Sequence, residues 1–343
     1  MSRRPSGRSS HPFGERRAHV TTNAHLTLGA RASVKVLVSG ANGYVGLSAV
    51  RALARAGHAV FGLVRTPEKG VPVVAARGQV VVGDVLDPRS LEHAVRSMEA
   101  IVHLANARGP DAQKVRAFGA RNLIRAARGA GVRQFILGSG YWLHGSRRGT
   151  ITEETPTPGP GPSINNLRAE EEAMEAHRTH AIDATIVRPG MAYGPATWFP
   201  PMVKEIREGT YRYPGRGSNH WSPVHIDDVG EAYRVILERG AAGHAYLVVD
   251  DEPVPVRSLA AFIATEIGAT LPKGKAPSEL GRTLDPDLVK VLSMNQAASN
   301  AKLRRLGWRP EYPTYREGVP PVLRELRYRL TSPEGASTAL QRS

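Results

Sequence analysis

The chain has 343 residues, of which 41% are hydrophobic and 22% are charged, with a formal net charge of +15. These proportions are ordinary for a globular protein that buries a full core, so they exclude a chain that is disordered throughout. The absence of cysteine excludes disulfides, thiolate metal sites and a cysteine nucleophile, and it suits a reducing cytoplasm. No apolar run approaches the roughly 18 residues that a membrane span needs, so we expect a cytoplasmic protein without a membrane span.

A third of the net charge lies at the N-terminus. Residues 1–33 carry six arginines and one acid, Glu15, and the remaining excess is spread along the chain with no basic patch interleaved with aromatic residues. We therefore predict no nucleic-acid partner. An arginine-rich, serine-rich and acid-poor start resembles a transit peptide, although a disordered arm or a start codon assigned too far upstream explains it more simply. We expect residues 1–33 to lie outside the fold.

The most informative stretch begins at Val34, where a short β-branched run predicts a buried parallel strand. Three glycines follow in GANGYVG, and apolar residues then recur at helical spacing until Gly57 ends the helix. A second apolar strand is expected over 59–64. This order predicts a dinucleotide site, because the glycines let the backbone approach a pyrophosphate and the helix N-terminus offers its amides to the charge.

Further strands and helices alternate along the chain. IVHLANA is expected to be the fourth strand, and NLIRAARGAGVRQFILGSG predicts another helix followed by a strand. Proline-rich breaks at TPTPGPGP and ATWFPP mark where the chain leaves the sheet, and later segments return strands to it. The pattern predicts an α/β protein with a doubly wound parallel sheet.

Several segments resemble the extended branch of the short-chain dehydrogenase/reductase superfamily, which includes nucleotide-sugar epimerases and dehydratases. They are GANGYVG, IVRPGMAYGP, VHIDDVGEAY and SNAKLRRLGWRPEY, in the family's order and spacing. The resemblance implies a Rossmann-type NAD(P)-binding domain over 34–188, a smaller C-terminal substrate-binding lobe over 189–330 intertwined with it, and a tail over 331–343. It also implies a homodimer and a small-molecule substrate.

The resemblance also assigns the residues that contact the cofactor. Arg65 ends the second strand, where an acid would bind the ribose 2′-hydroxyl of NAD and an arginine can pair with the 2′-phosphate of NADP. NADP is favoured, and NAD stays open because an arginine in a loop can face water. The implied contacts are Gly40, Asn42, Gly43, Tyr44, Val45, Gly46, Arg65, Asp84, Val85, Leu104, Ala105, Arg168 and Pro189.

The family's catalytic Tyr-x-x-x-Lys pair is missing. Counting back from Glu172, taken as the usual glutamate of the family helix, places Arg168 at the lysine and Ile164 at the tyrosine. No lysine occurs between Lys114 and Lys204, and no tyrosine has a lysine four residues later. Arginine is a poor acid or base, because its pKa is too high, although it can hold a ribose hydroxyl or an oxyanion.

Other residues near the site are candidates for the missing role. The family's catalytic serine position falls on Gly140, with Ser139 just before it and Tyr141 just after. We expect Tyr141, Ser139 or an ordered water to be the proton donor. Arg168 is the third candidate catalytic residue, as a group that holds a ribose hydroxyl or an oxyanion. His144 and His225 are expected to be packed, and no spacing of His, Asp and Glu suggests a metal site.

The predicted substrate contacts are aromatic. Sugar-nucleotide enzymes of the family clamp the diphosphate with an arginine where this chain has Trp221, so a hydrophobic or aromatic substrate is favoured. Trp142 and Tyr193 are the other implied contacts, and the alternatives are that Trp221 belongs to the core and Tyr193 is structural.

These features support three hypotheses for function. The first is an NAD(P)H-dependent reductase acting on a carbonyl of a hydrophobic or aromatic small molecule, for example in secondary metabolism, whose activated substrate needs little acid catalysis. The second is a nucleotide-sugar epimerase or dehydratase, which the missing tyrosine, lysine and arginine disfavour. The third is a non-catalytic NAD(P)-binding regulator.

Overall fold

The structure is a computed structural model that describes residues 33–107, 111–112, 114–157 and 164–331. Nearly all of the basic N-terminal arm and of the C-terminal tail singled out above lies outside these ranges, as do 158–163 in the first proline-rich break. The described residues belong to one compact unit.

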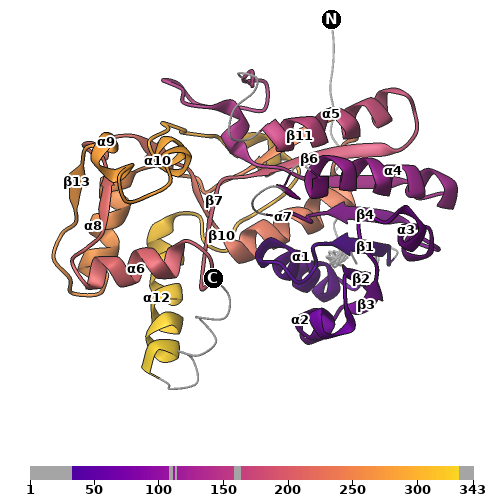
Figure 1. The fold of residues 1–343 in the computed structure, drawn as a ribbon, viewed down its shortest axis with the longest axis horizontal. Coiled ribbons are helices and arrows are strands. Elements are labelled where there is room, and N and C mark those ends of the chain that lie inside the picture. Colours follow the sequence, from indigo (N-terminus) through magenta and orange to yellow (C-terminus); the bar gives the residue numbers. More distant parts are fainter. Residues whose placement is uncertain (1–32, 108–110, 113, 158–163, 332–343) are drawn as a thin grey trace, which may run out of the picture. The chain divides into compact units, whose positions relative to one another are not determined.

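A seven-stranded parallel sheet forms the centre of this unit (Figure 1). Its order is β11-β6-β5-β4-β1-β2-β3, so the chain reverses direction across the sheet between β1 and β4. The strands are β1 (Lys35–Ser39), β2 (Ala59–Val64), β3 (Gln79–Val82), β4 (Ala100–His103), β5 (Gln134–Gly138), β6 (Asp183–Pro189) and β11 (Ala245–Val248). This Rossmann-type architecture confirms the predicted fold class, and β11 shows the second half of the chain completing the sheet.

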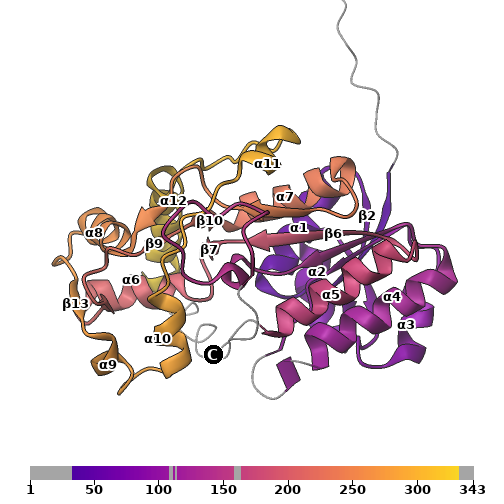
Figure 2. The same ribbon diagram turned by 90° about the horizontal axis from the view of Figure 1, so that it is seen from above.

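Helices cover both faces of the sheet, as Figures 1 and 2 show. On one face pack α1 (Tyr44–Arg55), α2 (Val71–Ala75) and α7 (Ile226–Arg239), and on the other α3 (Pro88–Ala94), α4 (Gly119–Ala130) and α5 (Ile164–Arg178). The central strands are buried on both sides as a result, and all four residues of β4 are buried, whereas β3 at the edge of the sheet is partly exposed. That burial explains the continuous apolar runs in the sequence.

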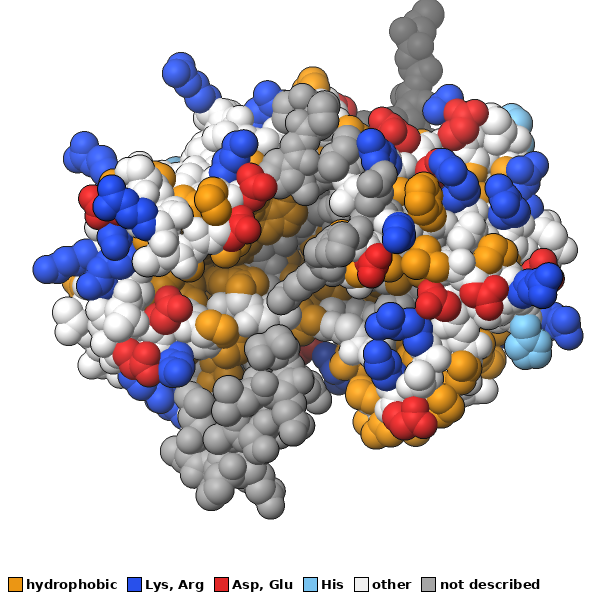
Figure 3. Space-filling model, in the orientation of Figure 1, with side chains coloured by type: hydrophobic (Ala, Val, Ile, Leu, Met, Phe, Trp, Pro, Cys, Tyr) orange, Lys and Arg blue, Asp and Glu red, His pale blue; other side chains and the backbone are white. Residues whose placement is uncertain are grey.

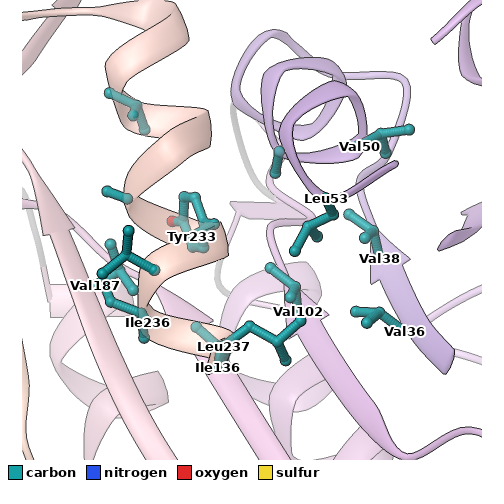
Figure 4. Packing of buried hydrophobic residues seen from close by; sticks show 14 of the residues in the cluster. Val36, Val38, Val50, Leu53, Val102, Ile136, Val187, Tyr233, Ile236 and Leu237 are labelled. Carbon is teal, nitrogen blue, oxygen red and sulfur yellow. The ribbon is translucent and has the colours of Figure 1, made fainter. Parts of the chain in front are cut away.

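The layer between α1, α7 and the sheet is the largest hydrophobic cluster of the described residues (Figure 4). Val36 and Val38 of β1 meet Val50 and Leu53 of α1 there, and Tyr233 reaches into the layer from α7. Burial of such side chains contributes roughly 1.5–3 kcal/mol each. This packing joins α7, from the second half of the chain, directly to α1, the helix that follows the glycine turn.

The second half of the chain also builds a lobe beside the sheet (Figure 2). The buried side chains of this lobe form a second hydrophobic cluster, called the second cluster below. The short strands of the lobe pair as β10 with β7, β12 with β9 and β13 with β8. The strands are β7 (Met191–Tyr193), β8 (Arg212–Pro214), β9 (His220–Trp221), β10 (Pro223–His225), β12 (Val254–Pro255) and β13 (Lys273–Lys275). The helices are α6 (Phe199–Arg207), α8 (Val256–Glu266), α9 (Pro277–Leu280), α10 (Pro286–Leu292), α11 (Ala301–Arg305) and α12 (Tyr315–Thr331).

Candidate active site

A cavity of about 710 Å³ lies along the carboxyl ends of the central strands. That volume is within the range of small-molecule and cofactor sites. It is lined by Gly40, Asn42, Gly43, Tyr44, Val45, Gly46, Leu63, Val64, Arg65, Lys69, Gly83, Asp84, Val85, Leu86, Leu104, Ala105, Asn106, Ala107, Asp111, Lys114, Val115, Arg116, Gly138, Ser139, Pro189, Thr197 and Tyr233. In Figure 3 the molecular face is hollowed near its middle, and hydrophobic side chains line part of the hollow.

The glycine turn between β1 and α1 requires glycine for steric reasons. Gly40 has φ +68°, and a Cβ on it would lie 2.7 Å from the backbone nitrogen of Ala105. A Cβ on Gly46 would lie 2.0 Å from the carbonyl oxygen of Gly40. The N-cap of α1, Gly43, makes no side-chain cap, and the first turn has no acidic residue. The first amides of α1 are therefore open to an anion such as a pyrophosphate.

All but one of the residues that the sequence assigns to the cofactor line this cavity. At the end of β2, the exposed side chains of Arg65 and Lys69 add two cations. The carboxylate of Asp84 accepts a hydrogen bond from the backbone nitrogen of Leu86 at 2.9 Å, which shapes the turn after β3. The donors, cations and apolar walls thus fit a dinucleotide with its phosphates at the glycine turn.

Arg168 is the exception. It lies in a second, shallow pocket on the outer face of α4 and α5, with Arg121 and Glu172 among its neighbours. Arg168 was matched to the family's lysine by taking Glu172 as the family's glutamate. The buried glutamate of α5 is instead Glu170, which is 4% exposed, whereas Glu172 pairs with Arg121 near the surface. The structure therefore corrects the assignment of Arg168 to the cofactor and to catalysis.

Counting from Glu170 instead places Asn166 at the lysine position. The amide nitrogen of Asn166 lies 3.4 Å from the point that a Cβ on Gly140 would occupy, beside the loop that follows β5. The corresponding tyrosine position is Pro162, outside the described residues. Either count leaves the site without the family's pair.

Tyr141 does not reach the cavity. Its side chain is fully buried in the second cluster, with its ring edge to face with Trp142 at 5.0 Å between centroids. Burial raises the pKa of the Tyr141 hydroxyl above its ordinary value, which makes it a poor acid. Trp142 is half-buried and packs over Gly140, and it too lies away from the cavity lining. These positions correct the assignment of Tyr141 as proton donor.

Trp221 and Tyr193 belong to the core rather than to a substrate surface. Trp221 is 2% exposed and its indole nitrogen donates to the carbonyl of Leu292 at 3.1 Å, while its ring packs edge to face on Trp198. Tyr193 is 1% exposed and packs against Phe199. The structural alternative holds for both residues, because each is enclosed by the second cluster.

His144 and His225 are packed, as expected. His144 belongs to a buried network. Arg188 contacts the Nε2 of His144 at 3.2 Å and donates hydrogen bonds to both carboxylate oxygens of Glu170. His225 caps α7 by accepting from the backbone nitrogen of Asp227. Burial lowers the pKa of both imidazoles, so they stay neutral near pH 7.

Three groups at the inner wall of the cavity form a corner around Gly138. Ser139 was expected there, but Arg116 and Tyr233 were not. Arg116 comes from the π-helical segment η3 (Lys114–Phe118) that leads into α4. Such turns are rare in proteins overall, and those that occur are often found at functional sites. Tyr233 comes from α7. Nothing in the sequence singles out either residue, because only tertiary packing brings them to β5.

The loop that closes this end of the cavity is strained. Thr197 lines the cavity with φ +62°, a left-handed conformation that is unfavourable for a β-branched residue. The adjacent indole of Trp198 donates to the carbonyl oxygen of Ala192 at 2.7 Å and holds the loop. Such strain clusters at ligand sites, where the surrounding structure enforces it.

Comparison with known proteins agrees with this geometry. A family model described as NAD(P)H-binding matches residues 40–197. A dTDP-glucose 4,6-dehydratase of Streptomyces venezuelae, solved with NAD bound, superposes with a TM-score of 0.73 at 25% identity, covering 85% of this chain and 96% of that one. In its fold and in these matches the chain is similar to enzymes of the extended short-chain dehydrogenase/reductase superfamily. Its cofactor domain binds NAD(P)H.

Two of the curated relatives are named as reductases. A 3-diazoavenalumate denitrifying reductase of a Streptomyces species is 29% identical over 83% of this chain and 99% of the relative. A 4-hydroxy-2-methyl-3-oxo-4-farnesyl-3,4-dihydroquinoline-1-oxide ketoreductase of Stigmatella aurantiaca is 25% identical over 73% of this chain and 78% of the relative. At the level of the family, the chain is an NAD(P)-dependent oxidoreductase.

The described residues offer neither a metal site nor a membrane span. They contain no cluster of three or more His, Cys, Asp and Glu that could hold a metal ion. In the same part of the chain, every helix is too short or too polar to cross a membrane.

Proposed function

We propose that this protein is an NAD(P)H-dependent reductase acting on the carbonyl of a hydrophobic or aromatic small molecule. One observation carries the proposal: a single cavity runs from the glycine turn to Ser139 and Thr197, so one wall can hold the dinucleotide and the far end can hold a substrate. When bound, the reduced cofactor supplies the hydride. The reduction then needs only a group that stabilises negative charge on the substrate oxygen.

Two further features support this substrate class. The position where a sugar-nucleotide enzyme would carry a phosphate-clamping arginine holds Trp221, whose burial in the core leaves no cation at that place. Both named relatives are reductases whose names describe aromatic or heteroaromatic compounds. We further propose that residues 189–330 supply the wall that covers the substrate, and that Arg65 and Lys69 favour NADPH over NADH.

A second candidate is a nucleotide-sugar dehydratase or epimerase. The likeness to the dTDP-glucose 4,6-dehydratase, which covers 96% of that chain, favours it. The missing Tyr-x-x-x-Lys pair weighs against it, because epimerisation and dehydration use the tyrosine as a base.

The test is a turnover assay on the full chain. We would measure NADH and NADPH binding by calorimetry and then follow loss of the reduced-cofactor absorbance with aromatic ketones, quinones and a matched set of dTDP- and UDP-sugars. The expected result is tighter binding of NADPH and oxidation with at least one ketone or quinone. Cofactor binding without oxidation by any compound would instead indicate a regulator, and turnover of a nucleotide sugar would overturn the proposed substrate class.

A further inference from the structure

Three buried polar atoms at the carboxyl end of β5 have no hydrogen-bond partner among the described residues. They are the Oγ of Ser139, the Nε of Arg116 and the hydroxyl of Tyr233. All three residues line the cavity. Buried polar groups in native proteins are almost always paired, so three unpaired groups at one place need a ligand or ordered water to complete them.

All three residues adjoin Gly138, by a contact or in the chain. Arg116 donates from Nη1 to the carbonyl oxygen of Gly138 at 2.6 Å. The hydroxyl of Tyr233 lies 2.8 Å from the point that a Cβ on Gly138 would occupy, so a larger residue there would displace it. Ser139 is the next residue along the chain. The guanidinium of Arg116 and the hydroxyl of Tyr233 therefore both lie against one backbone position, and Ser139 adjoins it in the chain.

No carboxylate among the described residues balances the positive charge of Arg116. Its side chain is 9% exposed, and among the described residues no carboxylate lies within ion-pairing distance of it. The nearby Glu170 is already held by Arg188, at 3.0 Å from Nε and 2.6 Å from Nη2. A guanidinium keeps its proton even when buried, so the unpaired cation favours binding of an anion.

The position of Arg116 along the sheet indicates which anion this is. β5 is separated from β1 by β4, which puts Gly138 about 10 Å from the glycine turn, where the amides for a pyrophosphate lie. Arg65 and Lys69, at the end of β2, lie farther along the sheet in the same direction. Arg116 therefore lies toward the opposite end of the cavity from the groups suited to phosphates, at the same strand end as Ser139.

We propose that Arg116 and Ser139 bind and stabilise the substrate oxygen that becomes negatively charged during reduction. This inference rests on the proposed function. The carbonyl carbon accepts a hydride from the reduced nicotinamide, which is thereby oxidised, and the electron pair of the C=O π bond moves to oxygen. The Oγ–H of Ser139 and the Nε–H of Arg116 donate to this alkoxide, which later takes a proton from water.

Arg116 acts here through charge and not as an acid. A protein that stabilises the alkoxide in this way does not need the tyrosine and lysine that the chain lacks. Tyr233 remains a neutral neighbour, because burial raises the pKa of its hydroxyl. The site would suit any small molecule that presents a negative oxygen next to an aromatic or apolar body.

Binding of benzoate tests the anion site without turnover. Benzoate carries a negative oxygen on an aromatic ring, and calorimetry on the full chain saturated with NADP⁺ would measure its affinity. We expect wild type to bind, Arg116→Met to weaken benzoate at least tenfold and Ser139→Ala to weaken it a few-fold, with NADP⁺ affinity unchanged in both. The matched control is Arg121→Met, which removes an exposed arginine of α4 outside the cavity and leaves benzoate affinity unchanged.

A pH series on wild type keeps the inference testable if Arg116→Met does not fold. Benzoate affinity should stay constant from about pH 7 to about pH 10, because a guanidinium does not titrate there, whereas a site built on an ammonium group would begin to lose its charge. A fall in affinity toward pH 10 would overturn the assignment. Absent benzoate binding in wild type, unchanged affinity in Arg116→Met, or a parallel loss of NADP⁺ affinity in that variant would also overturn it. Failure of the proposed reduction would appear separately, as binding without turnover in the ketone assay.

Discussion

His103 links the sheet to the corner of the site and gives the protein a pH dependence. It is fully buried on β4, where its Nδ1 lies 2.6 Å from the Oγ of Ser39 and its Nε2 lies 3.4 Å from the carbonyl oxygen of Arg116. Burial, with the charge of Arg116 adding to it, lowers the pKa of His103 to about 3. In the unfolded chain this pKa is about 6.5.

The lowered pKa predicts a loss of stability in mild acid. Between about pH 6.5 and about pH 3, His103 is protonated in the unfolded chain but stays neutral in the folded protein. The free energy of unfolding therefore falls as the pH falls. Urea unfolding at a series of pH values from about 7 to about 4 would measure the slope. His103→Gln should flatten it, leaving the part that His144 contributes, whose pKa burial lowers to about 4.

The exposed His180 offers the control. His180→Gln should keep the wild-type slope, because it changes a side chain at the surface and leaves the buried His103 in place. Equal slopes in wild type and His103→Gln would show that His103 does not account for the acid sensitivity.

Individual site residues were predictable from sequence only where local geometry decides them. The glycines of GANGYVG and the residues at the strand ends were assigned to the cofactor, and they line the cavity because a strand, a turn and a helix fix their positions. Tyr141 and Trp221 were assigned to the site from their place in the chain, yet packing of the second cluster buries them. Arg116 and Tyr233 come from elements more than a hundred residues apart, and no local pattern predicts that they meet at Gly138.

At the scale of elements, α1 and α7 pack so closely that one glycine decides the distance between them. A Cβ on Gly230 of α7 would lie 2.3 Å from the Oγ of Ser48 and 2.5 Å from its backbone oxygen. Ser48 is itself fixed, since its Oγ donates to the carbonyl of Ile226 at 2.7 Å. The helices can accept a methyl group only by moving apart.

Gly230→Ala is therefore expected to destabilise the protein by about 1–3 kcal/mol, as overpacking of a core does. Urea unfolding followed by circular dichroism measures the change. Gly129→Ala in α4 is the matched control, because a Cβ there meets nothing within 4 Å, and replacing a helical glycine by alanine should stabilise by up to about 1 kcal/mol. A Gly230→Ala protein as stable as wild type would contradict the close packing of the two helices.

The order of elements was predictable for the same reason that the glycine turn was. Continuous β-branched runs and helical periodicity predicted β1, α1 and β2 within two or three residues of their observed ends. The register of α5 was not predictable, since GluGluGlu at 170–172 offers three equivalent anchors in sequence. Only burial of Glu170 beside Arg188 distinguishes them. Sequence periodicity thus identifies an element, while a buried ion pair fixes its rotation.

At the scale of the whole molecule, the outer face of α4 and α5 is the surface best suited to a second copy of the chain. Phe118 is 43% exposed there, in the shallow pocket that also holds Arg121, Arg168 and Glu172. The pocket is lined by Ala117, Phe118, Arg121, Arg168, Glu171, Glu172, Glu175 and Arg178. A face with an apolar centre and charges of both signs can meet its own copy across a twofold axis, with each arginine opposite a glutamate. In such a dimer Arg168 would lie at the interface, in place of the catalytic role that its sequence position suggested.

We therefore predict a homodimer that Phe118→Asp dissociates. Each copy would lose the burial of one phenylalanine, roughly 1.5–3 kcal/mol, and the symmetry doubles the loss, so the dissociation constant should rise by about a hundredfold or more. Sedimentation velocity over a range of concentrations measures it. Leu288→Asp, at a similarly exposed position on α10, is the control and should leave the dimer intact. A wild-type protein that sediments as a monomer would exclude the dimer. Dissociation by Leu288→Asp alone would place the interface at α10, which packs with the second cluster, and not at α4, which packs on the sheet.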